Sequence, residues 1–174
     1  SEYTSGSIET LGKASWLYGR VEIRARLPKG KGIWPAIWMM GTNITTAGYP
    51  DCGEIDIMEY VGKEKERVYG TIHMKRPGGG GVVSRGNNIL LDRPEDQFFT
   101  YNLEWTPEKL LILFDDEPVL EFNRADEEKK TEVWPFDKPQ YLKLNTALGG
   151  AWSGEIAPDT CPTDFQIDYV RVYQ

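Results

Sequence analysis

The feature that most constrains the fold is a series of short segments in which apolar and polar residues alternate. The clearest is "SWLYGRVEIRARLP", where Leu17, Val21, Ile23, Ala25 and Leu27 would share one face of a strand. Similar segments recur every 8 to 12 residues or so, with Gly- and Pro-containing turns between them. The pattern predicts an all-β fold, a β-sandwich or jelly roll of two antiparallel sheets.

Two segments stand apart from this pattern. Only residues 125–132 could form a short helix, and "KRPGGGGVVSRGNN", at residues 75–88, is interpreted as a flexible loop. The chain of 174 residues contains no internal repeat or low-complexity linker. We therefore expect residues 1–174 to form a single domain.

The composition argues against a nucleic-acid partner, a membrane span and a disulfide framework. The formal net charge of −7 opposes binding to nucleic acid, and a neutral or cationic partner suits the chain better. No apolar run is long enough to span a membrane, and no signal peptide is visible. Cys52 and Cys161 are expected to be free thiols, because a domain built on disulfides would contain more cysteines.

The segment "GEIDIMEYVG", residues 53–62, places three acids in an apolar strand. Glu54 and Asp56 are two residues apart and would share a face, but a regular strand would turn Glu59 into the core. A buried, unpaired carboxylate is costly, and one extra residue in the strand avoids that cost. We therefore predict a β-bulge near Ile57 and Met58 that brings all three acids to one face.

Three adjacent acids favour sugar hydrolysis, in which two carboxylates flank the glycosidic bond. Clustering would also raise some of their pKa values, because like charges oppose joint ionisation. Two alternatives remain open at this point. The acids could form a solvated acidic face, or they could bind calcium, although calcium usually needs about six to eight oxygens on a flexible loop.

Aromatic and basic residues near the acids support the first interpretation. Trp34 and Trp38 share a face and could stack on sugar rings, or they could pack in the core. Arg20 could bond sugar hydroxyls or lie in solvent. His73, the only histidine, is expected on the neighbouring strand, where it could bond the acids or the leaving-group sugar.

Several segments together resemble glycoside hydrolase family 16, in their residues, their order and their spacing. They are "YGRVEIRARLPKGKGIWPAIWMMG", "CGEIDIMEYVG", "GTIHM", "YNLEWTP", "WPFDKPQYLKLNTALGG" and "DYVRVYQ". The bulged acidic motif resembles the form found in laminarinase-like members. The resemblance implies a jelly roll of two antiparallel sheets with a concave substrate cleft. It also implies an endo-β-1,3-glucanase that cleaves laminarin-type or mixed-linkage β-glucans with retention of configuration and without a cofactor for catalysis.

The resemblance also implies a role for individual residues. It makes Glu54 the nucleophile, Glu59 the general acid/base and Asp56 the helper between them. Further matches fall on residues expected to contact the substrate: Trp34, Trp38, His73, Asn145 and, most weakly, Arg20. Asp168 matches a position that often helps to bind a structural calcium ion on the convex face, away from the chemistry.

Members of this family usually begin with strands that precede "YTSG", which predicts that N-terminal strands of the usual fold lie outside this sequence. We expect a secreted or extracytoplasmic monomer, unless such strands come from another chain. Two rival functions are a glucan-binding module without catalysis and an agarase- or carrageenase-like hydrolase of the same fold.

Overall fold

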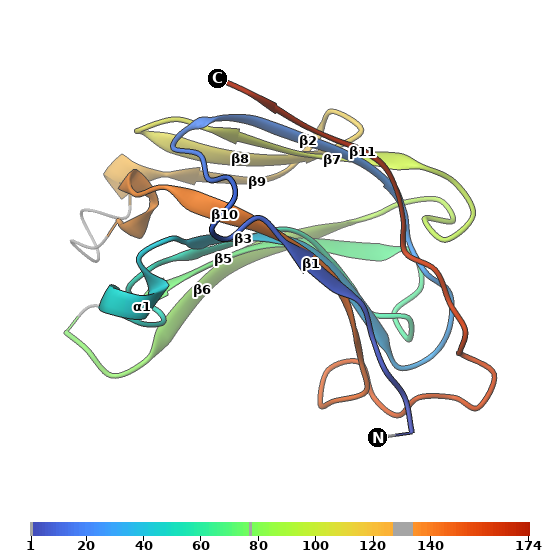
Figure 1. The fold of residues 1–174 in the computed structure, drawn as a ribbon. Coiled ribbons are helices and arrows are strands. Elements are labelled where there is room, and N and C mark those ends of the chain that lie inside the picture. The colour runs from blue at the N-terminus through green and yellow to red at the C-terminus, as the bar shows by residue number, and fades with distance from the viewer. Residues whose placement is uncertain (1, 77, 127–133) are drawn as a thin grey trace.

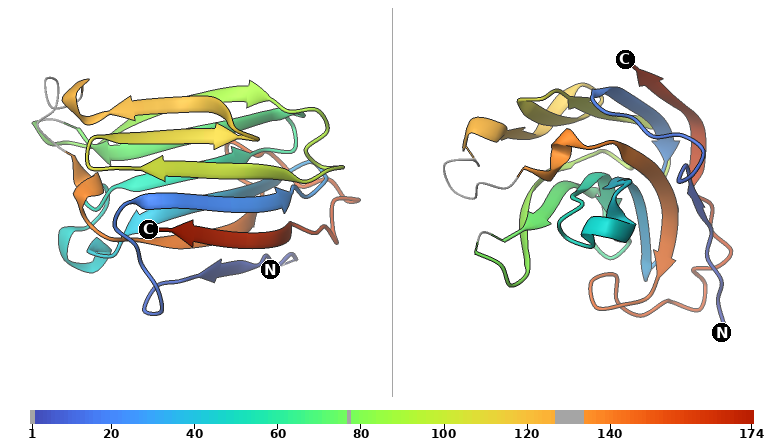
Figure 2. Two further views of the ribbon diagram at one scale, coloured as in Figure 1. Left: turned by 90° about the horizontal axis from the view of Figure 1, so that it is seen from above. Right: turned by 60° about the vertical axis from the view of Figure 1, so that its left-hand side comes forward.

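Two antiparallel β-sheets packed face to face form the described part of the chain, residues 2–76, 78–126 and 134–174 of a computed structural model (Figure 1). In spatial order, the six-stranded sheet contains β1 (Ser7–Glu9), β10 (Gln140–Leu148), β3 (Ile33–Gly41), β4 (Glu54–Tyr60), β5 (Arg67–Lys75) and β6 (Val82–Leu90). The five-stranded sheet contains β11 (Gln166–Tyr173), β2 (Gly19–Arg26), β7 (Phe99–Trp105), β8 (Lys109–Phe114) and β9 (Glu117–Asn123), as Figure 2 shows from above. The predicted sandwich is confirmed.

The core between the sheets follows the alternation seen in the sequence. Val21, Ile23 and Ala25 of β2, followed by Leu27, are at most 2% exposed, and Leu17 packs against them at the edge of the core. Their neighbours in β2 point outward and are only partly buried. Because burial of apolar surface is the main favourable term in folding, this one-sided pattern fixes which face of β2 meets the other sheet.

A two-residue turn, Asp115-Asp116, joins β8 and β9. Asp115 and Asp116 both have positive φ, at 47° and 65°. Such a turn matches the right-handed twist of the flanking strands, and Asp tolerates this conformation better than most residues. The carboxylate of Asp115 also accepts a hydrogen bond from the backbone of Thr100 at 2.7 Å.

The predicted loop at residues 75–88 is wrong for its second half. Residues 82–90 form β6, which pairs with β5 along its full length. Pairing with β5 outweighs the low strand propensity of the local glycines. Gly86 also allows β6 to lie close to β5, since a Cβ there would lie 3.0 Å from Thr71 Oγ1. The helix considered for residues 125–132 falls largely on residues 127–133, which lie outside the described residues.

The six-stranded sheet arches, and its hollow face is turned away from the five-stranded sheet (Figures 1 and 2). Two short elements complete the fold: α1 (Ile44–Ala47) and the 3₁₀ turn η1 (Pro135–Asp137). No helix in the described ranges has both the length and the apolar character needed to cross a bilayer. Cys52 and Cys161 are both free thiols, as predicted.

Candidate active site

The predicted bulge is present in β4 and controls the direction of its side chains. Asp56 pairs with Thr71 of β5 and Glu59 pairs with Tyr69, so that Ile57 and Met58 together stand opposite Gly70 alone. Both bulge residues are fully buried. The extra residue changes the alternation, and it returns Glu59 to the hollow face that carries Glu54 and Asp56.

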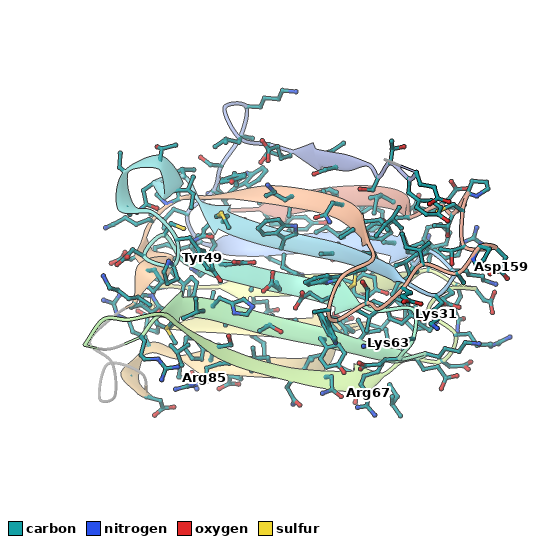
Figure 3. All side chains as sticks on the ribbon, turned by 90° about the horizontal axis from the view of Figure 1, so that it is seen from below. Lys31, Tyr49, Lys63, Arg67, Arg85 and Asp159 are labelled. Atoms are coloured by element: carbon teal, nitrogen blue, oxygen red, sulfur yellow. The ribbon has the colours of Figure 1, made fainter. Side chains whose placement is uncertain are left out.

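Glu54 is half-buried at the start of β4 and lies opposite His73 of β5. Its carboxylate is hydrogen-bonded to Asp56 and accepts a hydrogen bond from the phenol of Tyr49. Burial raises the pKa of Glu54, and the nearby charge of Glu59 adds to the effect, whereas His73 and the two hydrogen bonds oppose it. Figure 3 shows Tyr49 at the α1 end of the hollow face.

Asp56 is 2% exposed and sits in the middle of the group. Its Oδ2 lies 3.1 Å from Nε2 of His73. Desolvation by burial raises the pKa of Asp56 to about 6, and the hydrogen bond from His73 limits the rise. Burial lowers the pKa of His73, but its bond to Asp56 and the charges of the three acids outweigh this and raise it overall.

Glu59 is 8% exposed. The indole Nε1 of Trp34 donates to its Oε1 at 3.1 Å, and Thr71 forms a second hydrogen bond to the same carboxylate. Desolvation, followed by the charge of Asp56, raises the pKa of Glu59 to about 7. Near neutral pH this carboxyl group therefore holds a proton for much of the time, which is what a general acid requires.

The two tryptophans lie on the hollow face, as their spacing predicts. Trp34 packs edge-on against Trp152, with the ring centroids 5.1 Å apart. Trp38 lies opposite Asp56 in the ladder, and its Nε1 donates to Oδ1 of Asn145 at 2.8 Å. Asn145 therefore reaches the same face from β10. The structure places all three side chains on the hollow face, and their contacts with sugar remain a prediction.

Four residues of the site were not anticipated from the sequence: Tyr49, Thr71, Ser84 and Trp152. Alternation in "GTIHM" places Thr71 on the same face as His73, so this signal was available. Trp152 follows the Gly149-Gly150 turn, and Tyr49 lies in the loop before β4. Ser84 lies on β6, whose residues resemble a loop in the sequence. These positions depend on contacts between segments that are distant in the chain.

The expectation that Arg20 faces the substrate is wrong. Arg20 lies on β2 in the five-stranded sheet, where its guanidinium forms ion pairs with Glu22, Glu104 and Asp116 at 3.2–3.4 Å. The polar face of β2 is the outer surface of that sheet, since Val21 and Ile23 occupy the core side. Alternation identified the two faces of the strand correctly and left the polar face as either a solvated surface or a groove; the weak match of Arg20 to the family pointed to the wrong one.

The described residues around Asp168 do not fit a calcium site. Asp168 lies at an irregularity of β11, and its Oδ2 is 2.7 Å from Nη1 of Arg24. A carboxylate paired with a cation offers little to a second cation, and within the described ranges Asp168 belongs to no group of three or more His, Cys, Asp or Glu side chains placed to hold a metal ion. We derive no structural or catalytic role for calcium there.

Within the described ranges, only Glu54, Asp56 and His73 bring potential metal-ligating atoms within 4.8 Å of one another. These atoms bond to each other through the contacts given above. We interpret them as a hydrogen-bonded acid cluster. A cavity of about 720 Å³ lies elsewhere, between the N-terminal segment, β10 and residues 161–167, and is lined by none of the three acids. The acids lie outside this cavity, on the hollow face of the six-stranded sheet.

Comparisons with known proteins agree with this geometry. The family model described as glycosyl hydrolases family 16 matches residues 1–171. A beta-glucanase from Rhodothermus marinus is 46% identical over 99% of this chain and 63% of its own length. A glucan endo-1,3-beta-glucosidase from Cryptopygus antarcticus is 39% identical over 98% of this chain and 66% of its own. The chain thus spans about two thirds of the length of these relatives.

Among solved structures, the laminarinase catalytic domain from Thermotoga maritima superimposes with a TM-score of 0.87 at 41% identity. The match covers 97% of this chain and 68% of that one. The two-sheet architecture is therefore shared with that laminarinase catalytic domain. On the extent of the family match, this chain belongs to glycosyl hydrolase family 16.

Proposed function

We propose that this chain carries the catalytic site of an endo-acting, retaining β-1,3-glucanase that cleaves laminarin-type or mixed-linkage β-glucans. The observation that carries the proposal is the pair Glu54 and Glu59 on one face of a bulged strand, with the pKa of Glu59 raised to about 7. One carboxylate can then act as a nucleophile while the other is protonated. The names of the relatives, a beta-glucanase, a glucan endo-1,3-beta-glucosidase and a laminarinase, support a β-glucan substrate.

The proposed reaction is a double displacement. Glu54 attacks the anomeric carbon while Glu59 gives its proton to the departing glycosidic oxygen, which leaves a glycosyl ester on Glu54. Glu59, now a carboxylate, takes a proton from water as that water attacks the anomeric carbon and breaks its bond to the Glu54 oxygen. The sugar is released with its original configuration, Glu54 is restored as a carboxylate and Glu59 is restored as an acid.

Asp56 has a defined part in this cycle. It is bonded to Glu54 on one side and to His73 on the other, and its pKa of about 6 allows it to share a proton with Glu54. When Glu54 becomes an ester its charge is lost, and Asp56 can ionise more easily because one like charge has gone. His73 then stabilises the Asp56 carboxylate.

We further propose that the protein acts as a secreted or extracytoplasmic monomer. A polymeric glucan does not cross a bilayer, so its hydrolysis takes place outside the cytoplasm. All three acids and their partners come from one chain, so no second copy is needed to assemble them. Sedimentation in the presence and absence of laminarin oligosaccharides would test the monomer.

Incubation with laminarin, lichenan and a β-1,4-glucan, followed by assay of new reducing ends, tests the activity and its linkage preference. We expect cleavage of laminarin with a rapid fall in polymer length and little action on the β-1,4-glucan. NMR of the first product should show the β anomer, and an α anomer would contradict retention. Binding of laminarin without new reducing ends would identify a glucan-binding module. Cleavage of agar or carrageenan, with no cleavage of the glucans, would identify an agarase- or carrageenase-like hydrolase instead.

A further inference from the structure

Ser84 extends the hydrogen-bonded acid cluster to the edge of the sheet. It lies on β6 directly opposite His73, and its Oγ is 2.7 Å from Nδ1 of that ring. The other ring nitrogen, Nε2, lies 3.1 Å from Oδ2 of Asp56, which is bonded in turn to Glu54. A continuous series of close polar contacts therefore crosses three strands, from exposed Ser84 to Glu54.

A hydroxyl group is well suited to the Nδ1 position because it can both donate and accept. When His73 is neutral and carries its proton on Nε2, Ser84 donates to Nδ1. When the ring is protonated on both nitrogens, Ser84 accepts from Nδ1–H. In both states Nε2–H lies beside Oδ2 of Asp56, and Nδ1 keeps Ser84 as its partner.

We propose that Ser84 is a positioning residue: its hydroxyl holds the His73 ring with Nε2–H toward Asp56 and thereby sets the pH range in which Glu54 is ionised and Glu59 is protonated. The inference rests on the glycosidase function proposed above. Ser84 acts through His73 and Asp56, and it need not touch the substrate.

The charged groups around His73 determine the direction of the effect. Those that face it or lie beside it are Glu54, Asp56 and Glu59 on β4, Tyr49 in the preceding loop, Lys75 paired with Asp51, and Arg85, whose guanidinium donates to the Ser84 carbonyl. His73 lowers the pKa of all three acids of β4. Loss of the Ser84 hydroxyl removes the acceptor for Nδ1–H, which makes the protonated ring less favourable. Because the ring is then less often cationic, the pKa values of the three acids rise together.

The expected signature is a shift of the whole pH–rate profile. The acid limb reports ionisation of Glu54 and the basic limb reports deprotonation of Glu59, so both limbs move to higher pH when Ser84 loses its hydroxyl. If Ser84 only stabilised the local structure, its loss would lower the rate at every pH and leave both limbs of the profile at the same pH.

Ser84→Thr and Ser84→Val form a matched pair, because Thr and Val have the same shape and differ only in the hydroxyl. Ser84 is exposed on an edge strand, where β-branched residues are well tolerated. With laminarin as substrate, we expect both limbs of kcat/KM for the Val variant to lie about 0.5 pH unit above those of the Thr variant. Thr should restore the wild-type profile. Ser84→Ala should shift in the same direction but less, since water can reach Nδ1.

A second readout does not depend on activity. His73 is the only histidine, so its imidazole NMR signals can be titrated without assignment. The pKa of His73 should be lower in the Val variant than in the Thr variant. Superimposable pH profiles and His73 titrations in the Thr and Val variants would overturn the inference. A wild-type protein that does not cleave laminarin would overturn the proposed function instead, and the His73 titration would still decide the role of Ser84.

Discussion

Trp34 donates its indole N–H to Oε1 of Glu59 across 3.1 Å, so a tryptophan of β3 acts directly on a carboxylate of β4. A hydrogen bond to the ionised form of a carboxylate favours that form, and this contact lowers the pKa of Glu59 against the larger effect of burial. Trp34 therefore has an electrostatic part in the site as well as any contact it makes with sugar.

Replacement of Trp34 by Phe tests this contact. The ring remains, the donor is lost, and the pKa of Glu59 should rise above about 7. We expect the basic limb of kcat/KM to move up by about half a pH unit while the acid limb stays within error. A pH–rate profile on laminarin measures both limbs. A basic limb that stayed in place, or that moved to lower pH, would show that the indole N–H does not act on Glu59.

The two glutamates should respond differently to a good leaving group. Glu59→Gln removes the proton donor, so hydrolysis of laminarin should fall about 10³-fold, whereas formation of the glycosyl-enzyme from an activated aryl glucoside should be spared. Glu54→Gln removes the nucleophile and should abolish both. Rapid-mixing measurement of aryl alcohol release distinguishes the two variants. Equal losses with both substrates in both variants would contradict the assigned roles.

Stability should fall as the pH rises through the range in which the acid cluster ionises. The pKa of Glu59 is about 7 in the folded protein and near 4.5 when unperturbed, so between these values the folded state binds more protons than the unfolded state. The raised pKa values of Asp56 and His73 act in the same direction.

Glu59→Gln removes the ionising group and should relieve this cost. At pH 8 the variant should exceed the wild type by about 2 kcal/mol in the free energy of unfolding, and at pH 4 the two should be equal. Urea unfolding at both pH values provides the measurement. Glu121→Gln, at an exposed position of β9, is the matched control. A variant less stable than the wild type at pH 8 would oppose a cost of ionisation at this site.

The Arg24–Asp168 pair predicts the effect of metal removal. The pair is exposed on the outer sheet, and such pairs contribute less than about 1 kcal/mol. Asp168→Asn should therefore change the melting temperature by no more than a few degrees. EDTA should leave both the melting temperature and laminarin hydrolysis unchanged. A large drop in melting temperature with EDTA, restored by calcium and absent in Asp168→Asn, would revive the calcium site.

The acid cluster was predictable because regular alternation along β4 conflicts with the cost of burying Glu59. Alternation would have buried Glu59, and the cost of that burial required an extra residue near Ile57 and Met58, where the bulge occurs. Alternation in β2 likewise identified the core residues correctly. It could not tell which outer face of the sandwich was the groove, so it left Arg20 either in solvent or at the substrate, and the structure places Arg20 on the outer face of the five-stranded sheet.

Contacts that depend on pairing between distant strands were beyond local rules. The Ser84–His73 bond requires β6 to pair with β5 across a glycine-rich connection that resembles a loop in the sequence. The pairing is stabilised by the ladder and by the close fit at Gly86, and neither is visible in the local pattern of residues. The same holds for Tyr49, whose hydrogen bond to Glu54 depends on the path of the loop before β4.

The most direct test of the two-carboxylate mechanism is to trap the intermediate. A laminarin-type oligosaccharide with fluorine at C2 of the reacting sugar and an activated leaving group forms the glycosyl-enzyme faster than it is hydrolysed. Mass spectrometry of the digested protein should then find one sugar ester, on Glu54, and none in the Glu54→Gln variant. A label on Glu59 or Asp56, or steady turnover of the normal substrate by Glu54→Gln, would contradict the account.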